Sequence, residues 1–154
     1  MKTASSIAAK VALALGKGIL AGLAGTAAIS VSQLIEMKLT GREPSTTPAK
    51  AVGKVLHLRI TNNEYKEQFV QEIHWTYGLL WGFARSVLDL AGVKGMPATA
   101  VHYAAIWGTE MVMLPSIDVA PPVMEWGGKE IVKDGMNHLV YALAAGLVYD
   151  AIDK

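Results

Sequence analysis

The segment Gly18-Ile-Leu-Ala-Gly-Leu-Ala-Gly-Thr-Ala-Ala28 lies inside a long apolar run and decides the class of fold. The run extends from Val11 to Ile35 and is interrupted only by Lys17. About 20 predominantly apolar residues are enough to cross a bilayer as an α-helix. Small residues three or four positions apart let a second helix approach closely in lipid. The segment therefore predicts a transmembrane helix that packs through Gly18, Gly22 and Gly25.

Three further apolar segments follow, at residues 73–91, 98–114 and 136–152. The composition, 52% hydrophobic and 18% charged, also favours a bilayer over water as the solvent. Residues 49–60 place apolar and basic side chains at helical spacing, which is typical of a helix lying on a membrane surface. We expect an all-α membrane protein, with four transmembrane helices in a single integral membrane domain over residues 1–154 and a short interfacial helix in the first loop.

An internal repeat relates the second and fourth segments. His74-Trp-Thr-Tyr-Gly-Leu-Leu-Trp-Gly82 and His138-Leu-Val-Tyr-Ala-Leu-Ala-Ala-Gly146 share the pattern His-x-x-Tyr-small-x-x-x-Gly. Residues four apart share one face of a helix, so the small residues predict further helix-packing faces. The pattern indicates two tandem helix-loop-helix repeats, at residues 5–92 and 96–153, although chance similarity between apolar segments remains an alternative. The predicted packing residues are Gly78, Gly82, Ala142 and Gly146.

Four ionisable residues, one from each predicted span, form a candidate polar cluster: Glu36, His74, Glu110 and His138. With four spans, all of them fall near the same side of the membrane. One interpretation is that each glutamate binds the histidine of its own repeat. Two carboxylates and two imidazoles can also bind a divalent metal, but no Glu-x-x-His pair occurs on one helix. We therefore expect hydrogen-bonded pairs, with no metal and no other cofactor.

Arg85 and Asp89 stand one helical turn apart near the end of the second span. This spacing predicts an intramembrane ion pair within one helix. Charged residues inside a span are functional candidates by default. Because both residues are close to the membrane surface, anchoring to lipid headgroups is the simpler role.

Composition excludes several classes of function. The chain has no cysteine, and its formal net charge of +1 is spread along the sequence. Thiolate metal sites and nucleic-acid binding are therefore not expected. No nucleophile–base pair or nucleotide loop is apparent, so the chain is not expected to be an enzyme.

Three functional hypotheses remain. The first is an accessory or structural subunit that packs with other membrane subunits or with copies of itself. The second is a small transporter or proton relay that uses the intramembrane glutamates and histidines. The third is a haem- or metal-binding membrane protein.

A resemblance to a known family adds to these expectations. The glycine-rich run at residues 18–28, the His-x-x-Tyr-Gly pattern from His74, the prolines of Leu114-Pro115 and Ala120-Pro-Pro122, and His138-Leu-Val-Tyr141 resemble small bacterial inner-membrane proteins of unknown function, of the YagU-like type. The resemblance implies a multi-pass protein of the bacterial inner membrane and supplies no active site. Lysine and arginine counts favour cytoplasmic long loops and external termini.

Overall fold

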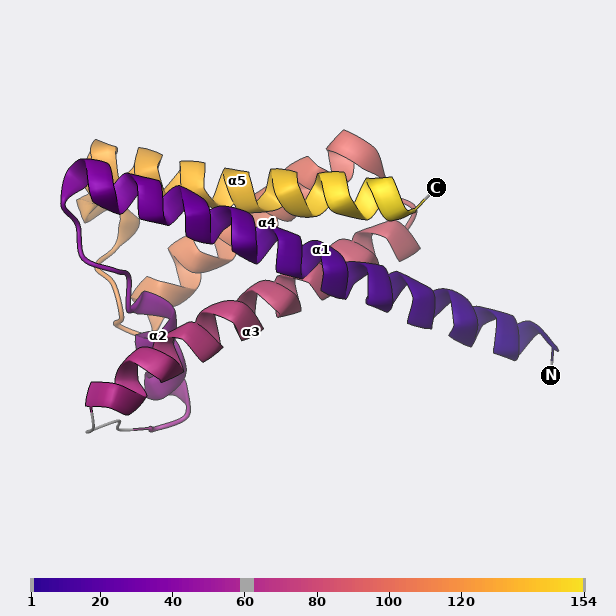
Figure 1. The fold of residues 1–154 in the computed structure, drawn as a ribbon, viewed down its shortest axis with the longest axis horizontal. Coiled ribbons are helices and arrows are strands. Elements are labelled where there is room, and N and C mark those ends of the chain that lie inside the picture. The colour runs from indigo at the N-terminus through magenta and orange to yellow at the C-terminus, as the bar shows by residue number, and fades with distance from the viewer. Residues whose placement is uncertain (1, 59–62, 154) are drawn as a thin grey trace.

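The structure is a computed structural model that describes residues 2–58 and 63–153, with side chains at 6–58 and 65–153. Every regular element in these residues is a helix, as predicted (Figure 1). The short helix expected in the first loop is present. The elements are α1 (Lys2–Thr40), α2 (Thr47–Val55), α3 (Asn63–Leu90), α4 (Gly95–Ser116), the single 3-10 turn η1 (Val123–Glu125) and α5 (Gly128–Ile152).

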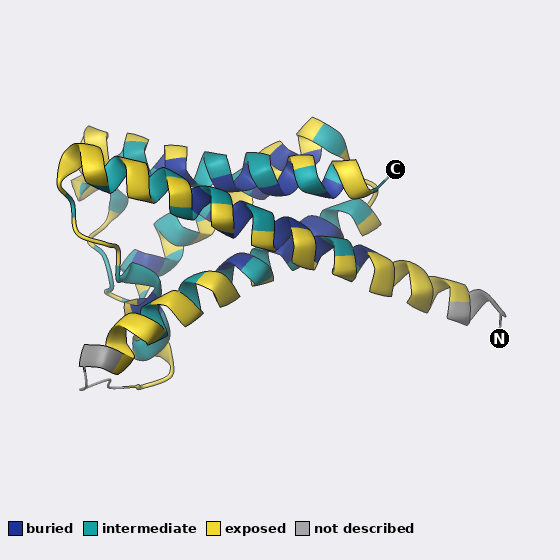
Figure 2. Ribbon diagram, viewed as in Figure 1, coloured by how far each residue is buried: buried dark blue, intermediate teal, exposed yellow. Residues whose placement is uncertain are grey.

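The four long helices alternate in direction, so their connections gather at two ends of the bundle (Figure 1). We call the end with the connections around α2 and η1 the loop end. The terminal end holds the turn between α3 and α4 and the C-terminus. Helix α1 packs extensively against α3 and α5, and α4 packs mainly against α5. The N-terminal turns of α1 project past the terminal end and are exposed from Ser6 to Leu13 (Figure 2).

Glycines bring α1 and α3 into backbone contact. A Cβ atom added to Gly82 would collide with the carbonyl oxygen of Gly18 and lie 2.8 Å from the Cα of Gly22. A Cβ atom on Gly22 would lie 2.9 Å from the carbonyl oxygen of Gly78. The buried hydroxyl of Ser86 adds a hydrogen bond from α3 to the α1 backbone. The two helices therefore cross at a distance that only glycine permits at these positions.

The other predicted packing residues also lie against neighbouring helices. A Cβ atom on Gly25 would lie 2.7 Å from the ring of Tyr141 on α5. Gly146 on α5 lies against the side chain of Thr99 on α4, and Ala142 is fully buried. Each predicted repeat thus packs its two long helices through small residues. The duplication itself stays a prediction.

Among the described residues, only α1 contains a segment that is long and apolar enough to cross a membrane, from Ser6 to Thr40. Only 22% of its most apolar stretch is buried in the bundle. The first half of helix α3 is polar, which lowers the mean hydropathy of this helix. Helix α4 contains many alanine, glycine and threonine residues between its large apolar side chains. Sequence and structure thus agree on a helical bundle, and the structure gives one candidate span among the described residues where the sequence predicted four.

The glycine crossing predicts a position-specific loss of stability. Replacing Gly82 with alanine forces the α1 and α3 backbones apart and is expected to lower the free energy of unfolding by about 1–3 kcal/mol. The matched control is Gly16→Ala, because a Cβ atom at Gly16 meets nothing within 4 Å. That control should be neutral or stabilising by up to ~1 kcal/mol. Unfolding followed by circular dichroism in detergent measures both, and equal effects would contradict the interface.

Candidate functional site

A cavity of about 400 Å³ lies inside the loop end of the bundle. Its walls come from all four long helices and from the loop after α1. All four residues of the predicted polar cluster line it: Glu36, His74, Glu110 and His138. Four carboxylates and only two permanently cationic side chains line this cavity, which therefore has an acidic excess: Glu36, Glu110, Glu130 and Asp134 against Arg42 and Lys133.

The closest contact in the cluster joins α4 to α5. His138 Nε2 lies 2.8 Å from Glu110 Oε2. His138 Nδ1 lies 2.9 Å from the backbone carbonyl oxygen of Asp134. A carbonyl oxygen only accepts hydrogen bonds, so Nδ1 carries a proton and Nε2 of the neutral ring bears a lone pair. The Glu110 carboxylate favours protonation of this nitrogen and so forms an ion pair with the ring, but Glu110 Oε2 accepts no aligned hydrogen bond in the described part of the chain.

The two residues from the first predicted repeat do not pair with each other. His74 Nε2 lies 3.0 Å from the hydroxyl oxygen of Ser30, and that hydroxyl donates its proton to the carbonyl of Thr26. His74 Nε2 is therefore the donor to Ser30. Glu36 instead accepts hydrogen bonds from Arg42, the shortest 2.6 Å, and is 3.7 Å from the amine of Lys133. The predicted pairing within each repeat thus occurs for Glu110 and His138 and is wrong for Glu36 and His74.

Asp134 was not among the predicted site residues. Its carboxylate accepts a hydrogen bond from Trp107 Nε1 at 2.9 Å and lies 3.6 Å from His138 Nδ1. One ligand atom each from Asp134, Glu110 and His138 fall within 4.8 Å of one another, a grouping that can hold a metal ion. The signal in the sequence was the spacing of Asp134 and His138, four residues apart on one helix.

Polar side chains continue from the cavity toward the terminal end. Tyr141 lines the cavity, and its hydroxyl donates to the carbonyl of Gly78. The Tyr141 ring packs edge-on against His102, with ring centroids 5.9 Å apart. His102 Nε2 lies 2.8 Å from the carbonyl of Trp81, so this nitrogen carries the proton. The lone pair of His102 Nδ1 is buried and has no hydrogen-bond partner among the described residues.

Arg85 follows His102 along the same interior. Its side chain is fully buried over the ring of Tyr149, 4.4 Å from the ring centre. Its Nη2 atom lies 2.5 Å from the carboxylate of Asp150, whereas Nε and Nη1 have no partner in the described part of the chain. The predicted Arg85–Asp89 pair is therefore wrong. Asp89 turns instead to Lys94, at 3.1 Å, and accepts a hydrogen bond from Tyr149.

A salt-bridge network closes the terminal end. Asp153 binds Lys17 at 2.6 Å and Lys94 at 2.9 Å, joining α1 to the turn before α4. The hydrogen bonds from Lys17 and then Lys94 lower the pKa of the Asp153 carboxyl below 3.8. Its contribution to stability is therefore present above pH 3.8 and is lost as the pH falls through the lowered pKa.

The change of partner for Arg85 can be tested by stability. Asp150→Asn leaves the buried guanidinium without its anion and is expected to lower the free energy of unfolding by about 1–3 kcal/mol, less than a fully buried pair because Asp150 is 40% exposed. Asp89→Asn keeps an oxygen that can accept from Tyr149 and should cost less than ~1 kcal/mol. The free energies of unfolding of both variants, measured by circular dichroism in detergent, give the comparison. A larger loss of stability for Asp89→Asn than for Asp150→Asn would instead support the Arg85–Asp89 pair that the sequence predicted.

Comparison with known proteins gives no match: no family model, no curated protein and no solved structure matches the chain. The YagU-like resemblance therefore stays a prediction. The description of the site therefore depends on its geometry alone.

Proposed function

We propose that the chain is a four-span protein of the bacterial inner membrane, with its long loops in the cytoplasm. The shortest long helix, α4, has 22 residues. At ~1.5 Å per residue it is about 33 Å long, against roughly 30 Å for the hydrocarbon core of a bilayer. Large apolar side chains face outward from all four long helices, as a lipid environment favours. Examples are Leu20 at 53%, Leu80 at 57%, Val112 at 72% and Leu147 at 69% exposed.

We further propose that the bundle relays protons, and the Glu110–His138 pair is the observation that carries this proposal. The pair brings a carboxylate within 2.8 Å of an imidazole at the wall of a cavity with an acidic excess. A proton entering the cavity can be taken up by this pair and released again without any covalent change. Ionisable groups at membrane depth are costly, and they typically mark ion or proton pathways.

The buried polar groups beyond the cavity support a route along the bundle. Tyr141, His102 and Arg85 follow one another from the cavity toward the terminal end, where Asp150 and Asp89 are located. The unpartnered atoms of His102 and Arg85 require buried water, because polar atoms inside proteins rarely stay without partners. Water bound there would connect the histidine to the arginine by hydrogen bonds, whereas Tyr141 and His102 meet through a ring contact.

This proposal takes the second of the functional hypotheses in preference to an accessory subunit. A packing role needs small residues on helix faces and no buried charge. The interior of this bundle holds a fully buried arginine, a buried histidine and a carboxylate in contact with a second histidine. Such groups cost stability and are retained where they serve a pathway.

Proton flux in reconstituted vesicles tests the proposal. With a pH-sensitive dye inside and a potassium diffusion potential as driving force, the wild-type protein should acidify or alkalinise vesicles faster than protein-free controls. Glu110→Gln keeps the size of the side chain but removes the carboxylate that pairs with His138. It should reduce the flux by about a hundredfold, the lower end of what positioned acid–base groups contribute.

The matched control is Glu130→Gln. Glu130 lines the same cavity, but its side chain is 61% exposed and paired with Lys133, so its loss should leave the flux near the wild-type value. Circular dichroism confirms that each variant is folded. A wild-type flux no greater than that of empty vesicles, or equal losses in both variants, would overturn the relay.

A further inference from the structure

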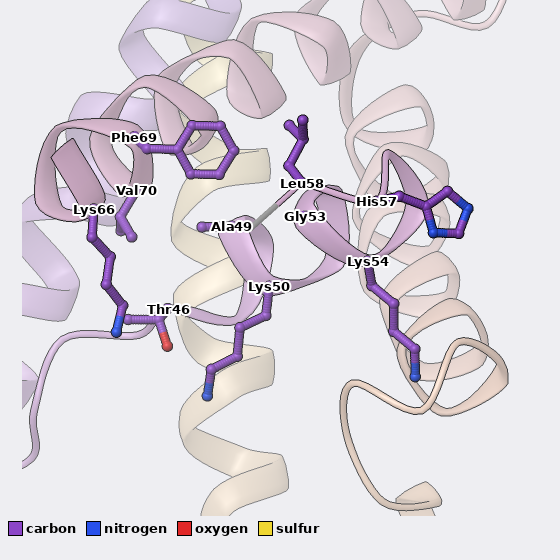
Figure 3. Close-up of a pocket in the computed structure, with 10 residues that line it drawn as sticks. All are labelled: Thr46, Ala49, Lys50, Gly53, Lys54, His57, Leu58, Lys66, Phe69 and Val70. Carbon is purple, nitrogen blue, oxygen red and sulfur yellow. The ribbon is translucent and has the colours of Figure 1, made fainter. Parts of the chain in front are cut away.

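A second pocket, of about 460 Å³, lies outside the bundle between α2 and the first turns of α3 (Figure 3). Its apolar part is formed by Ala49, Leu58, Phe69 and Val70. In Figure 3, Phe69 and Leu58 lie together on one side of α2. The amines of Lys50, Lys54 and Lys66 extend on the other side. The pocket thus combines an apolar patch with a group of cationic side chains.

The turn after α2 holds this arrangement in place. His57 adopts a left-handed backbone conformation, with φ 54°. This conformation lets the Leu58 N–H donate to the carbonyl of Gly53 at 2.8 Å, which folds Leu58 back onto α2. Ala49, which lines the pocket, and Ala51 are both buried. Helix α2 is therefore fixed at the loop end, with its lysines outside.

The charge of this pocket is unbalanced. Among the described residues that line it, three lysines and His57 are present and no carboxylate is. Lys54 has an exposed partner, Asp118, at 3.1 Å. Within the described part of the chain, Lys50 and Lys66 have no ion-pair partner. An anion is the complementary ligand, and lysine binds phosphate as a compact point charge.

The position of the pocket indicates which kind of phosphate it binds, a lipid headgroup or free phosphate. Helix α2 leaves Val55 and Leu56 exposed, at 59% and 60%, beside its lysines. A short helix with exposed apolar and basic side chains is suited to the boundary between headgroups and acyl chains. We propose that this pocket binds the phosphate of an anionic phospholipid, with the start of the lipid chains on the Phe69–Leu58 patch. The inference rests on the proposed membrane location and does not depend on proton relay.

Thermal unfolding in a neutral detergent, with added lipid, tests this inference. Phosphatidylglycerol micelles should raise the unfolding temperature of the wild-type protein more than phosphatidylcholine does. The double variant Lys50→Gln/Lys66→Gln should weaken the apparent affinity for phosphatidylglycerol by about 30-fold, at roughly fivefold per lysine near an anionic surface. The matched control, Lys38→Gln/Lys129→Gln, removes two exposed lysines at the same end of the bundle that do not line the pocket.

The alternative outcomes are distinct. Equal phosphatidylglycerol responses in the two double variants would overturn the pocket as the binding site. An equal response to inorganic phosphate alone would show that free phosphate is the ligand and overturn the lipid assignment. The Glu110→Gln variant should keep the wild-type lipid response, so failure of the relay and failure of the lipid site can be told apart.

Discussion

The close crossing of α1 and α3 is the constraint on which the rest of the structure depends. At Gly18, Gly22, Gly78 and Gly82 the two backbones touch. On the loop side of this crossing the helices diverge (Figure 1). The cavity lies in that divergence: its α1 residues begin at Thr26, and its α3 residues other than Trp81 lie at or before Gly78. The cavity therefore begins where the contacts between these glycines end.

The kind of polar group in the interior of the bundle changes from the loop end to the terminal end. At the loop end the cavity holds an acidic excess, and Glu110 lies 2.8 Å from the His138 ring. Beyond it, His102 and Arg85 are buried, each with nitrogen atoms that have no partner among the residues the structure describes. Asp150 and the Asp89–Lys94–Asp153 network then bring charge to the terminal end. In a low-dielectric surrounding each of these groups interacts strongly with its neighbours, so protonation of one changes the free energy of the next.

The two pockets at the loop end have opposite electrostatic character. The inner cavity is lined by an excess of carboxylates, whereas lysines surround the outer pocket on α2. Val70 of α3 lines both of them, so the two pockets meet at this side chain.

Helical periodicity in the sequence was enough to predict the elements and the small-residue faces. Residues four apart must share a face, so the contacts made by Gly18, Gly22, Gly78, Gly82 and Gly146 followed from local spacing. The alternation of four helices also brought Glu36, His74, Glu110 and His138 to one end without knowledge of packing. Ion-pair partners could not be predicted in this way, because they depend on how the helices are rotated and spaced relative to one another.

Spacing along α3 suggested Asp89 as the partner of Arg85, but the rotation of α5 against α3 placed Asp150 there instead. Glu36 likewise found Arg42 in the following loop, because His74 faces Ser30. The sequence by itself determined which residues share a helix face and a bundle end. Only the tertiary structure decided which of them touch, because contacts between helices depend on the rotation and distance set by the glycine crossing.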